Sequence, residues 1–255
     1  MKNNVLITIL VILFTHAIYA MAGGQIDTIR YENVTSGEPR YLTVYTPPSY
    51  HADSVYPVLY LLHGMHGNQH SWEDEAHIAE LADSLIQEGQ IEPLVIVMPL
   101  CVVNDTMTAY RLPSYLKSMH DFNHHIKKGE FEALYPEIET YVKTHYSIGN
   151  AKIAGLSSGA RQALNLSKQY HFDVVGLFSP VILQRHVPKK NTGTVFWIRC
   201  GSRDLFYARS RRINRRFNRY QIPHNFEKTT GRHNWQSWRI YIGEFLQFCF
   251  PPLQE

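Results

Sequence analysis

Short unbroken runs of apolar residues recur along the chain, and residues that favour turns bound each of them. Runs of this length without polar alternation are typical of strands buried on both faces, as in a parallel sheet. An earlier segment, Arg40–Thr46, alternates apolar and polar residues and ends at Pro47-Pro48, which predicts a strand. The runs that we interpret as buried strands are Tyr56–Leu62, Leu94–Leu100, Ala151–Gly155, Val174–Phe178 and Val195–Ile198.

Amphipathic segments lie between these runs and after the last of them. In Ile78–Gln87 the apolar residues recur every three to four positions, which would place them on one face of a helix. Strands that alternate with helices predict an open α/β sheet with right-handed crossovers, mostly parallel and with helices on both faces. The other expected helices are Phe131–Tyr146, Ser158–Tyr170, Arg209–Tyr220 and Trp235–Phe248.

The N-terminal segment differs from the rest of the chain. A positive start at Met1-Lys2 is followed by an apolar run over Val5–Phe14 and by Ala20-Met21-Ala22, the small-x-small pattern that a signal peptidase recognises. The apolar run is shorter than the roughly 20 residues that span a bilayer. We therefore expect residues 1–22 to be a cleaved signal peptide of a periplasmic or extracellular protein, without stable membrane insertion after cleavage. An uncleaved anchor is the alternative.

Composition indicates a folded domain without special cofactors. Hydrophobic residues make up 44% of the chain and charged residues 18%, and no repeat or linker divides residues 23–255, which we expect to form a single domain. The formal net charge of +3 is too small to indicate a nucleic-acid partner. The three cysteines, Cys101, Cys200 and Cys249, show no metal-ligand spacing, and we expect buried free thiols and no metal or other cofactor.

Residues 102–129 form a long, polar and irregular segment that is rich in Tyr, Met and His. Long excursions of this kind in α/β folds often form a lid or pocket wall near the functional site. An ordinary ordered surface loop is the other interpretation, and both stay open.

A candidate nucleophile follows the third buried run, in G-L-S-S-G at 155–159. This is a G-x-S-x-G pattern with an apolar strand before it and an amphipathic helix after it. In that context the glycines allow a sharp turn that presents Ser157 above the sheet at the start of a helix. Ser158 is the poorer candidate because it lies inside the start of the helix.

A serine nucleophile requires a base, and the base requires an acid that orients it. Asp204 ends G-S-R-D directly after a buried strand, whereas Asp173 precedes its strand and would lie at the opposite edge of the sheet. A turn-forming or helix-capping role is the alternative for Asp204. Among the downstream histidines, only His233 is expected at the carboxyl end of a strand, just before the last helix; the others are His171, His186 and His224.

Acyl transfer also requires two N–H donors for the developing oxyanion. The residue after the nucleophile, Ser158, is one expected backbone donor. The glycine-containing H-G-M-H-G at 63–67 follows an early strand, and the N–H of Met65 is the expected second donor. A metal site formed by His63, His66 and His70 is the alternative, but no carboxylate or cysteine completes it.

Four segments, Y-L-L-H-G-M-H-G, G-L-S-S-G, R-C-G-S-R-D and G-R-H-N-W-Q-S-W-R, resemble the esterase D and feruloyl-esterase-like group of α/β-hydrolases, which overlaps carbohydrate esterase family one. The most specific match is the family's G-x-H-x-W-x-x-W pattern at 231–238. The resemblance extends from about Ile26 to Phe248 and implies an α/β-hydrolase fold. It implies that the triad is Ser157, Asp204 and His233, with the oxyanion hole at Met65 and Ser158.

The chain departs from the family at two positions near the nucleophile. The family usually has G-L-S-M-G-G, whereas Ser158 replaces the methionine and Ala160 replaces the last glycine. Neither change removes a catalytic group, although both would reshape the floor of the pocket.

Together these features predict an exported serine carboxylesterase that hydrolyses feruloyl, acetyl or similar esters on carbohydrate through an acyl-enzyme. The expected substrate is a small-molecule or polysaccharide ester. Siderophore-ester hydrolysis and acyl transfer are alternatives within the same family. A non-catalytic carbohydrate-binding α/β domain is the alternative of another class. Six arginines between Arg209 and Arg219 form either a solvated helix surface or a contact for a polyanion.

Overall fold

A computed structural model describes residues 23–33, 37–101, 129–182, 186–190 and 193–252 of the protein. The expected signal peptide at 1–22 lies outside the described residues, as does all of the 102–129 segment except its last residue. Among the described residues, no helix is both long and apolar enough to span a bilayer.

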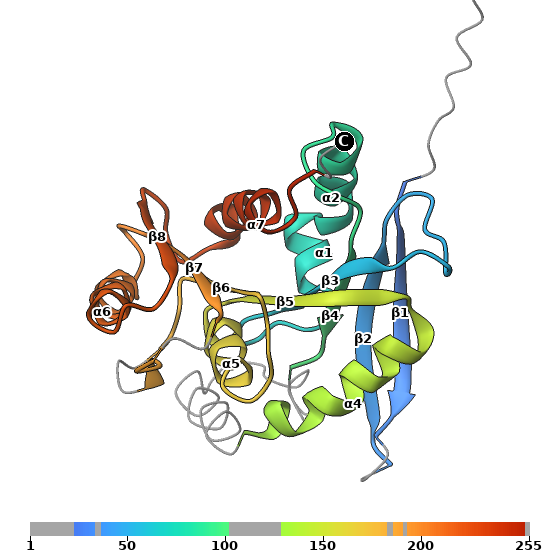
Figure 1. Ribbon diagram of the computed structural model, residues 1–255, viewed down its shortest axis with the longest axis horizontal. Coiled ribbons are helices and arrows are strands. Elements are labelled where there is room, and N and C mark those ends of the chain that lie inside the picture. Colours follow the sequence, from blue (N-terminus) through green and yellow to red (C-terminus); the bar gives the residue numbers. More distant parts are fainter. Residues whose placement is uncertain (1–22, 34–36, 102–128, 183–185, 191–192, 253–255) are drawn as a thin grey trace, which may run out of the picture.

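The described strands form an eight-stranded sheet with the order β1-β2-β4-β3-β5-β6-β7-β8 (Figure 1). The pairs β1–β2 and β2–β4 are antiparallel, and every other neighbouring pair is parallel. The expected α/β class with a mostly parallel sheet is confirmed. The bounds are β1 Gln25–Glu32, β2 Pro39–Thr46, β3 Tyr56–Leu62, β4 Val95–Pro99, β5 Ile148–Leu156, β6 Val174–Phe178, β7 Val195–Gly201 and β8 His224–Thr229.

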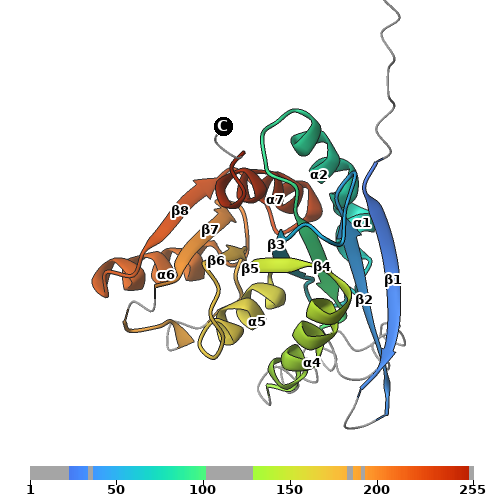
Figure 2. The ribbon, with the colours of Figure 1, turned by 45° about the vertical axis from the view of Figure 1, so that its right-hand side comes forward.

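Helices cover both faces of this sheet. Helices α4, α5 and α6 pack into the hydrophobic core on one face, and α1, α2 and α7 pack into the core on the other (Figures 1 and 2). Each expected buried strand therefore has a helix layer on either side. The bounds are α1 Ser71–Ala76, α2 Ile78–Gln87, α4 Glu130–His145, α5 Ser158–Leu166, α6 Tyr207–Arg219 and α7 Trp235–Cys249.

Strand β3 shows why the apolar runs lack polar alternation. Its successive side chains point to opposite faces, so Tyr60 and Leu62 join one core while Leu59 and Leu61 join the other. All four are essentially inaccessible to solvent. Both sets of positions must therefore be apolar, as in other parallel sheets with two covered faces.

The three cysteines are buried and unpaired, as expected. Burial raises the pKa of the Cys200 thiol to about 12, so this side chain stays protonated at neutral pH. Its sulfur behaves as a small apolar group at the end of β7.

Candidate active site

Ser157 occupies the sharp turn between β5 and α5. Its backbone has φ 54° and ψ −111°, a conformation that non-glycine residues rarely adopt. The turn is held by a hydrogen bond of 2.8 Å from the Ser157 N–H to the carbonyl of Phe178 at the end of β6. The strained backbone presents the side chain at the carboxyl edge of the sheet, where the sequence predicts it.

Both glycines of G-x-S-x-G are required by close backbone approach. A Cβ on Gly155 would lie 2.4 Å from the carbonyl carbon of Gly159, and a Cβ on Gly159 would lie 2.4 Å from the carbonyl oxygen of His63. The turn therefore packs directly onto the loop after β3. No larger residue fits at either position without a shift of the backbone.

Asp204 lies in the turn after β7, with its carboxylate buried. One of its oxygens, Oδ1, accepts a 2.7 Å hydrogen bond from the N–H of Phe206. Burial alone would raise the pKa of the Asp204 carboxyl, but hydrogen bonds from His233, Phe206 and Ser179 outweigh it and hold that pKa below its usual value. The group is therefore an anion at neutral pH.

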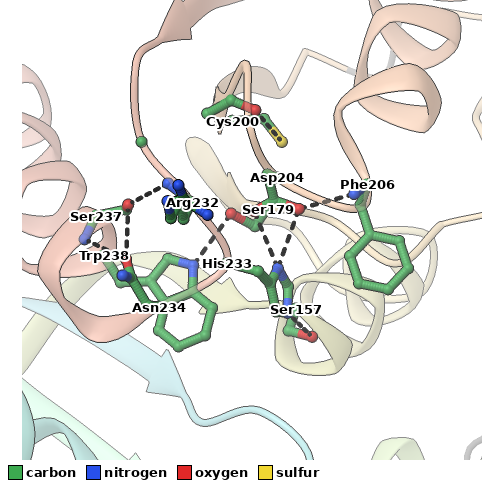
Figure 3. A network of polar contacts seen from close by, with 12 residues as sticks. Ser157, Ser179, Cys200, Asp204, Phe206, Arg232, His233, Asn234, Ser237 and Trp238 are labelled. Atoms are coloured by element: carbon green, nitrogen blue, oxygen red, sulfur yellow. Dashed lines mark hydrogen bonds and ion pairs between the residues drawn. The ribbon is translucent and has the colours of Figure 1, made fainter.

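His233 lies between Ser157 and Asp204 (Figure 3). Its Nε2 is 3.1 Å from Ser157 Oγ, and its Nδ1 is 3.0 Å from Asp204 Oδ2. The structure thus brings together the three side chains that the sequence predicts as a triad, with His233 within hydrogen-bonding distance of both Ser157 and Asp204. In this arrangement Nδ1 carries the proton shared with the carboxylate, and Nε2 can accept the proton of the serine hydroxyl.

The loops that carry the acid and the base are clamped to each other. The N–H of Arg203 donates to the carbonyl of Gly231, and a Cβ on Gly201 would lie 2.0 Å from that same oxygen. Glycine at 201 is therefore needed for Asp204 and His233 to approach each other.

The start of α7 fixes the loop on the other side of His233. Asn234 is the N-cap of the helix, and its side chain accepts from both the N–H and the hydroxyl of Ser237. The Ser237 hydroxyl oxygen in turn accepts from the N–H of Arg232, at 2.9 Å. Residues on both sides of His233 are thus bonded to the first turn of α7. The sequence prediction missed this cap, although Asn three residues before Ser at a helix start was a visible signal.

Ser179 and Trp238 lie behind Asp204 and support it, and the sequence prediction missed Ser179. Ser179, fully buried directly after β6, hydrogen-bonds Asp204 through its hydroxyl and accepts from the indole N–H of Trp238 at 3.1 Å (Figure 3). Ser179 also has a positive φ of 47°, which indicates that this position is constrained. Trp238 and Phe206 both contact the imidazole of His233 with their rings, at centroid distances of 4.9 Å.

The expected oxyanion donors lie beside the nucleophile. Met65 follows Gly64, where a Cβ would be 2.4 Å from the Leu156 side chain and 3.5 Å from the Cβ of Ser157. Met65 and Ser158 both line the cavity that contains Ser157. The loop after β3 therefore packs against the turn that carries Ser157.

Both ring nitrogens of His63 hydrogen-bond the backbone around this loop, so neither nitrogen is available to a metal. Its Nδ1 lies 2.7 Å from the carbonyl of Gly64, and its Nε2 accepts from the N–H of Cys101 at 3.0 Å. Burial lowers the pKa of His63 to about 4, so the ring is neutral at physiological pH. In the described part of the chain, no three His, Cys, Asp or Glu side chains are arranged to bind a metal ion.

A cavity of about 420 Å³ opens above Ser157 and His233. Most of its walls are apolar or aromatic, and the charged side chains in its lining are Glu75 and Arg161. Leu205, at its edge, is 84% exposed. The wall residues of apolar or aromatic character are Met65, Leu156, Val181, Leu205, Phe206, Trp235 and Trp238.

A model of the family described as "Putative esterase" matches residues 34–244. The chain is also 28% identical over 163 residues to an endo-1,4-beta-xylanase/feruloyl esterase of Xylanibacter ruminicola. That match covers 61% of this chain and 22% of the relative, so the chain spans about a fifth of the length of this curated relative.

Solved structures of esterases have the same fold. A ferulic acid esterase superposes with a TM-score of 0.75 at 21% identity, over 89% of this chain and 97% of that chain. A CE1 ferulic acid esterase from Anaeromyces mucronatus in complex with ferulic acid gives 0.69 at 22% identity, over 90% and 92%. A fluorophosphonate-binding serine hydrolase of Staphylococcus aureus gives 0.65 at 20% identity, over 89% and 98%. The fold is that of the α/β-hydrolase esterases, as the resemblance implied.

Proposed function

Because the chain belongs to the esterase family that matches residues 34–244, we propose that it is a serine carboxylesterase that acts through an acyl-enzyme. The observation that carries the proposal is the continuous set of contacts from Asp204 through His233 to Ser157, with 3.0 Å and 3.1 Å between the bonded atoms. A serine is a weak nucleophile unless a base of this kind is placed beside it.

In the first half-reaction, Ser157 Oγ attacks the acyl carbonyl while His233 Nε2 takes the hydroxyl proton. The N–H groups of Met65 and Ser158 stabilise the negative charge on the carbonyl oxygen. The imidazolium then donates its proton to the leaving alcohol, and the acyl group stays on Ser157. Asp204 keeps the ring in the required orientation and stabilises its positive charge.

In the second half-reaction, a water molecule replaces the alcohol. His233 takes a proton from the water as it attacks the acyl-enzyme, and the same proton returns to Ser157 Oγ when the ester bond to the enzyme breaks. The products are a carboxylic acid and the regenerated serine, and no cofactor takes part in either step.

We further propose that the protein is exported and that its substrate is a feruloyl, acetyl or similar ester on carbohydrate. The N-terminal pattern at 1–22 supports export. The likeness to a xylanase/feruloyl esterase supports a carbohydrate ester, and the aromatic walls of the cavity suit an aromatic acyl group. We propose a small-molecule or polysaccharide ester as the substrate and no nucleic-acid partner.

A fluorophosphonate probe and a panel of feruloyl, acetyl and short-chain aryl esters test this function. We expect the native protein to react with the probe and to hydrolyse at least one class of ester. We expect Ser157→Ala to lose labelling completely and hydrolysis by about 10⁴-fold or more. Equal labelling of native protein and variant, or hydrolysis that survives the substitution, would show that Ser157 is not the nucleophile.

A further inference from the structure

Arginine makes up most of the exposed surface of helix α6, and we call this set of side chains the α6 arginine face. It consists of the exposed Arg211, Arg212, Arg215 and Arg219, together with the half-buried Arg209 and Arg216. The apolar residues of the helix, Ile213 and Phe217, are fully buried in the core. No acidic residue occurs anywhere in the helix.

None of these six guanidinium groups forms an ion pair with any described residue. Arg199 shows the contrast, because its guanidinium is paired with Glu227 and Glu244. Four arginines of the face instead lie over aromatic rings. Arg209 lies over Phe206, Arg211 over Tyr207, and both Arg216 and Arg219 over Tyr220, at 5.0 to 5.9 Å from the ring centroids.

The spacing of these arginines is unfavourable within the protein. Arg211, Arg215 and Arg219 follow one another at intervals of four residues, and Arg212 and Arg216 form a parallel row. Like charges at this interval repel each other on a helix surface and destabilise it. Since no intramolecular anion offsets the repulsion in the described structure, an external polyanion is the partner that this face complements.

The α6 arginine face begins at the cavity. Leu205 and Phe206, the two residues before α6, line the cavity beside Ser157. Arg209 lies in the first turn of the helix over the ring of Phe206, and α6 continues from there along β7 and β8 at one end of the sheet (Figure 2). A polymer with an ester group in the cavity can therefore extend directly onto the arginines.

We propose that the α6 arginine face binds the carboxylate groups of a uronate-containing polysaccharide, the chain on which the ester substrate is carried. This inference rests on the proposed esterase function and adds a substrate class to it. The arginine side chain suits carboxylates because its planar fork donates two parallel hydrogen bonds. A bilayer is the poorer partner, because the large apolar side chains of α6, Ile213 and Phe217, are buried in the core and the helix exposes no large apolar side chain that could insert into it.

The first test compares polymeric and small substrates. The ratio of kcat/KM for acetylated, uronate-bearing xylan to kcat/KM for an aryl acetate is measured for native protein and for a triple variant with Arg211→Gln, Arg215→Gln and Arg219→Gln. We expect the ratio to fall about tenfold in the variant, because each exposed ion pair contributes little and three are removed together. The native ratio should also fall with rising salt, which screens such contacts.

Two controls isolate the contribution of the carboxylates. A second triple variant with Gln at the exposed Lys143, Lys189 and Lys190 removes the same charge elsewhere and should retain the native ratio. Xylan whose carboxyl groups have been reduced to alcohols should not distinguish native protein from the arginine variant. An unchanged ratio in the arginine variant, or an equal fall in the lysine variant, would overturn the proposal.

The second test measures binding without turnover. Ser157→Ala protein, with and without the arginine substitutions, is titrated with polygalacturonate and with duplex DNA at the same ionic strength. We expect polygalacturonate to bind more tightly than DNA and to lose binding with the substitutions; tighter binding of DNA would overturn the proposal. If no ester is hydrolysed in the first test, the proposed function fails, while the binding measurement still decides whether this face binds a polyuronate.

Discussion

The buried Ser179 hydroxyl accepts a hydrogen bond from Trp238 and bonds the carboxylate of Asp204, and the second of these contacts lowers the pKa of that carboxyl. A donor to a carboxylate stabilises the anion and lowers its affinity for a proton. Removing that donor therefore raises the pKa of the Asp204 carboxyl and favours the protonated form of the Asp204–His233 pair. Hydrogen bonds to charged groups are among the stronger ones in proteins, so the effect should be measurable.

For Ser179→Ala we expect kcat/KM to fall about tenfold, on the scale of one hydrogen bond to a charged group. The acid limb of its pH profile, which reports protonation of the pair in the free enzyme, should move to higher pH. Ser179→Gly removes the same hydroxyl and relieves the positive φ of 47°, so it should move the limb equally. A lower rate with an unmoved limb would mean that Ser179 has only a packing role.

At the residue scale, the sequence predicts the three side chains of the proposed triad but not Ser179, which hydrogen-bonds Asp204. Ser157 could be predicted because a turn motif marks it in the sequence. His233 could be predicted because it follows the expected end of a strand. Ser179 follows β6 without any motif, and its partner Trp238 is 59 residues away. A contact between two such segments depends on the packing of β6 against α7, which no local pattern contains.

At the scale of single elements, α7 positions the base through its N-cap. Asn234 bonds Ser237, and Ser237 bonds the N–H of Arg232, so the cap holds the residues on either side of His233. For Asn234→Ala we expect a loss of about 1 kcal/mol in the free energy of unfolding, the usual value for a lost cap. We also expect a lower kcat/KM, because the imidazole is no longer held in one orientation.

Urea unfolding and ester hydrolysis measure the two effects. Asn234→Ser keeps a capping side chain and serves as the matched variant, so it should retain most of the stability and activity that the alanine variant loses. Equal losses in both variants would indicate that the specific asparagine, rather than the cap, is what the loop needs.

The elements themselves were largely predictable because burial imposes simple periodicities. Strands covered on both faces must be apolar throughout, and Ile78–Gln87 shows the period of a helix with one buried face, as α2 does. The role of the loop glycines could not be predicted in this way. Gly201 and Gly231 meet only when the ends of β7 and β8 lie side by side, so their role becomes visible only in the structure.

At the scale of the whole molecule, the strand order β1-β2-β4-β3-β5-β6-β7-β8 determines which loops meet. Periodicity predicted a mostly parallel sheet, but it does not specify the order, since each strand could satisfy its burial beside several others. Strand β5 lies between β3 and β6, and this placement brings the loop after β3 to Ser157. The same order places Asp204 and His233 on neighbouring strand ends.

His63 joins three parts of this architecture. It directly follows strand β3, its Nε2 accepts from the N–H of Cys101 after β4, and the carbonyl of Cys101 accepts from Gln162 of α5. This junction lies beneath the loop that carries Met65. A neutral imidazole is required, because the buried ring must both donate at Nδ1 and accept at Nε2.

Because His63 must be neutral in the folded protein, we expect the free energy of unfolding to decrease as the pH falls and His63 becomes protonated. Its pKa is about 4 in the folded state, below the ordinary value of 6.5, so the unfolded chain binds the proton more readily. The sign follows directly: this contribution is complete above about pH 6.5 and is lost as the pH falls toward 4, by up to roughly 3 kcal/mol. Denaturant unfolding of native protein and His63→Gln across this range isolates the effect from other titrating groups. The native advantage in free energy should shrink as the pH falls, and an advantage that stays constant would assign the acid sensitivity to other groups.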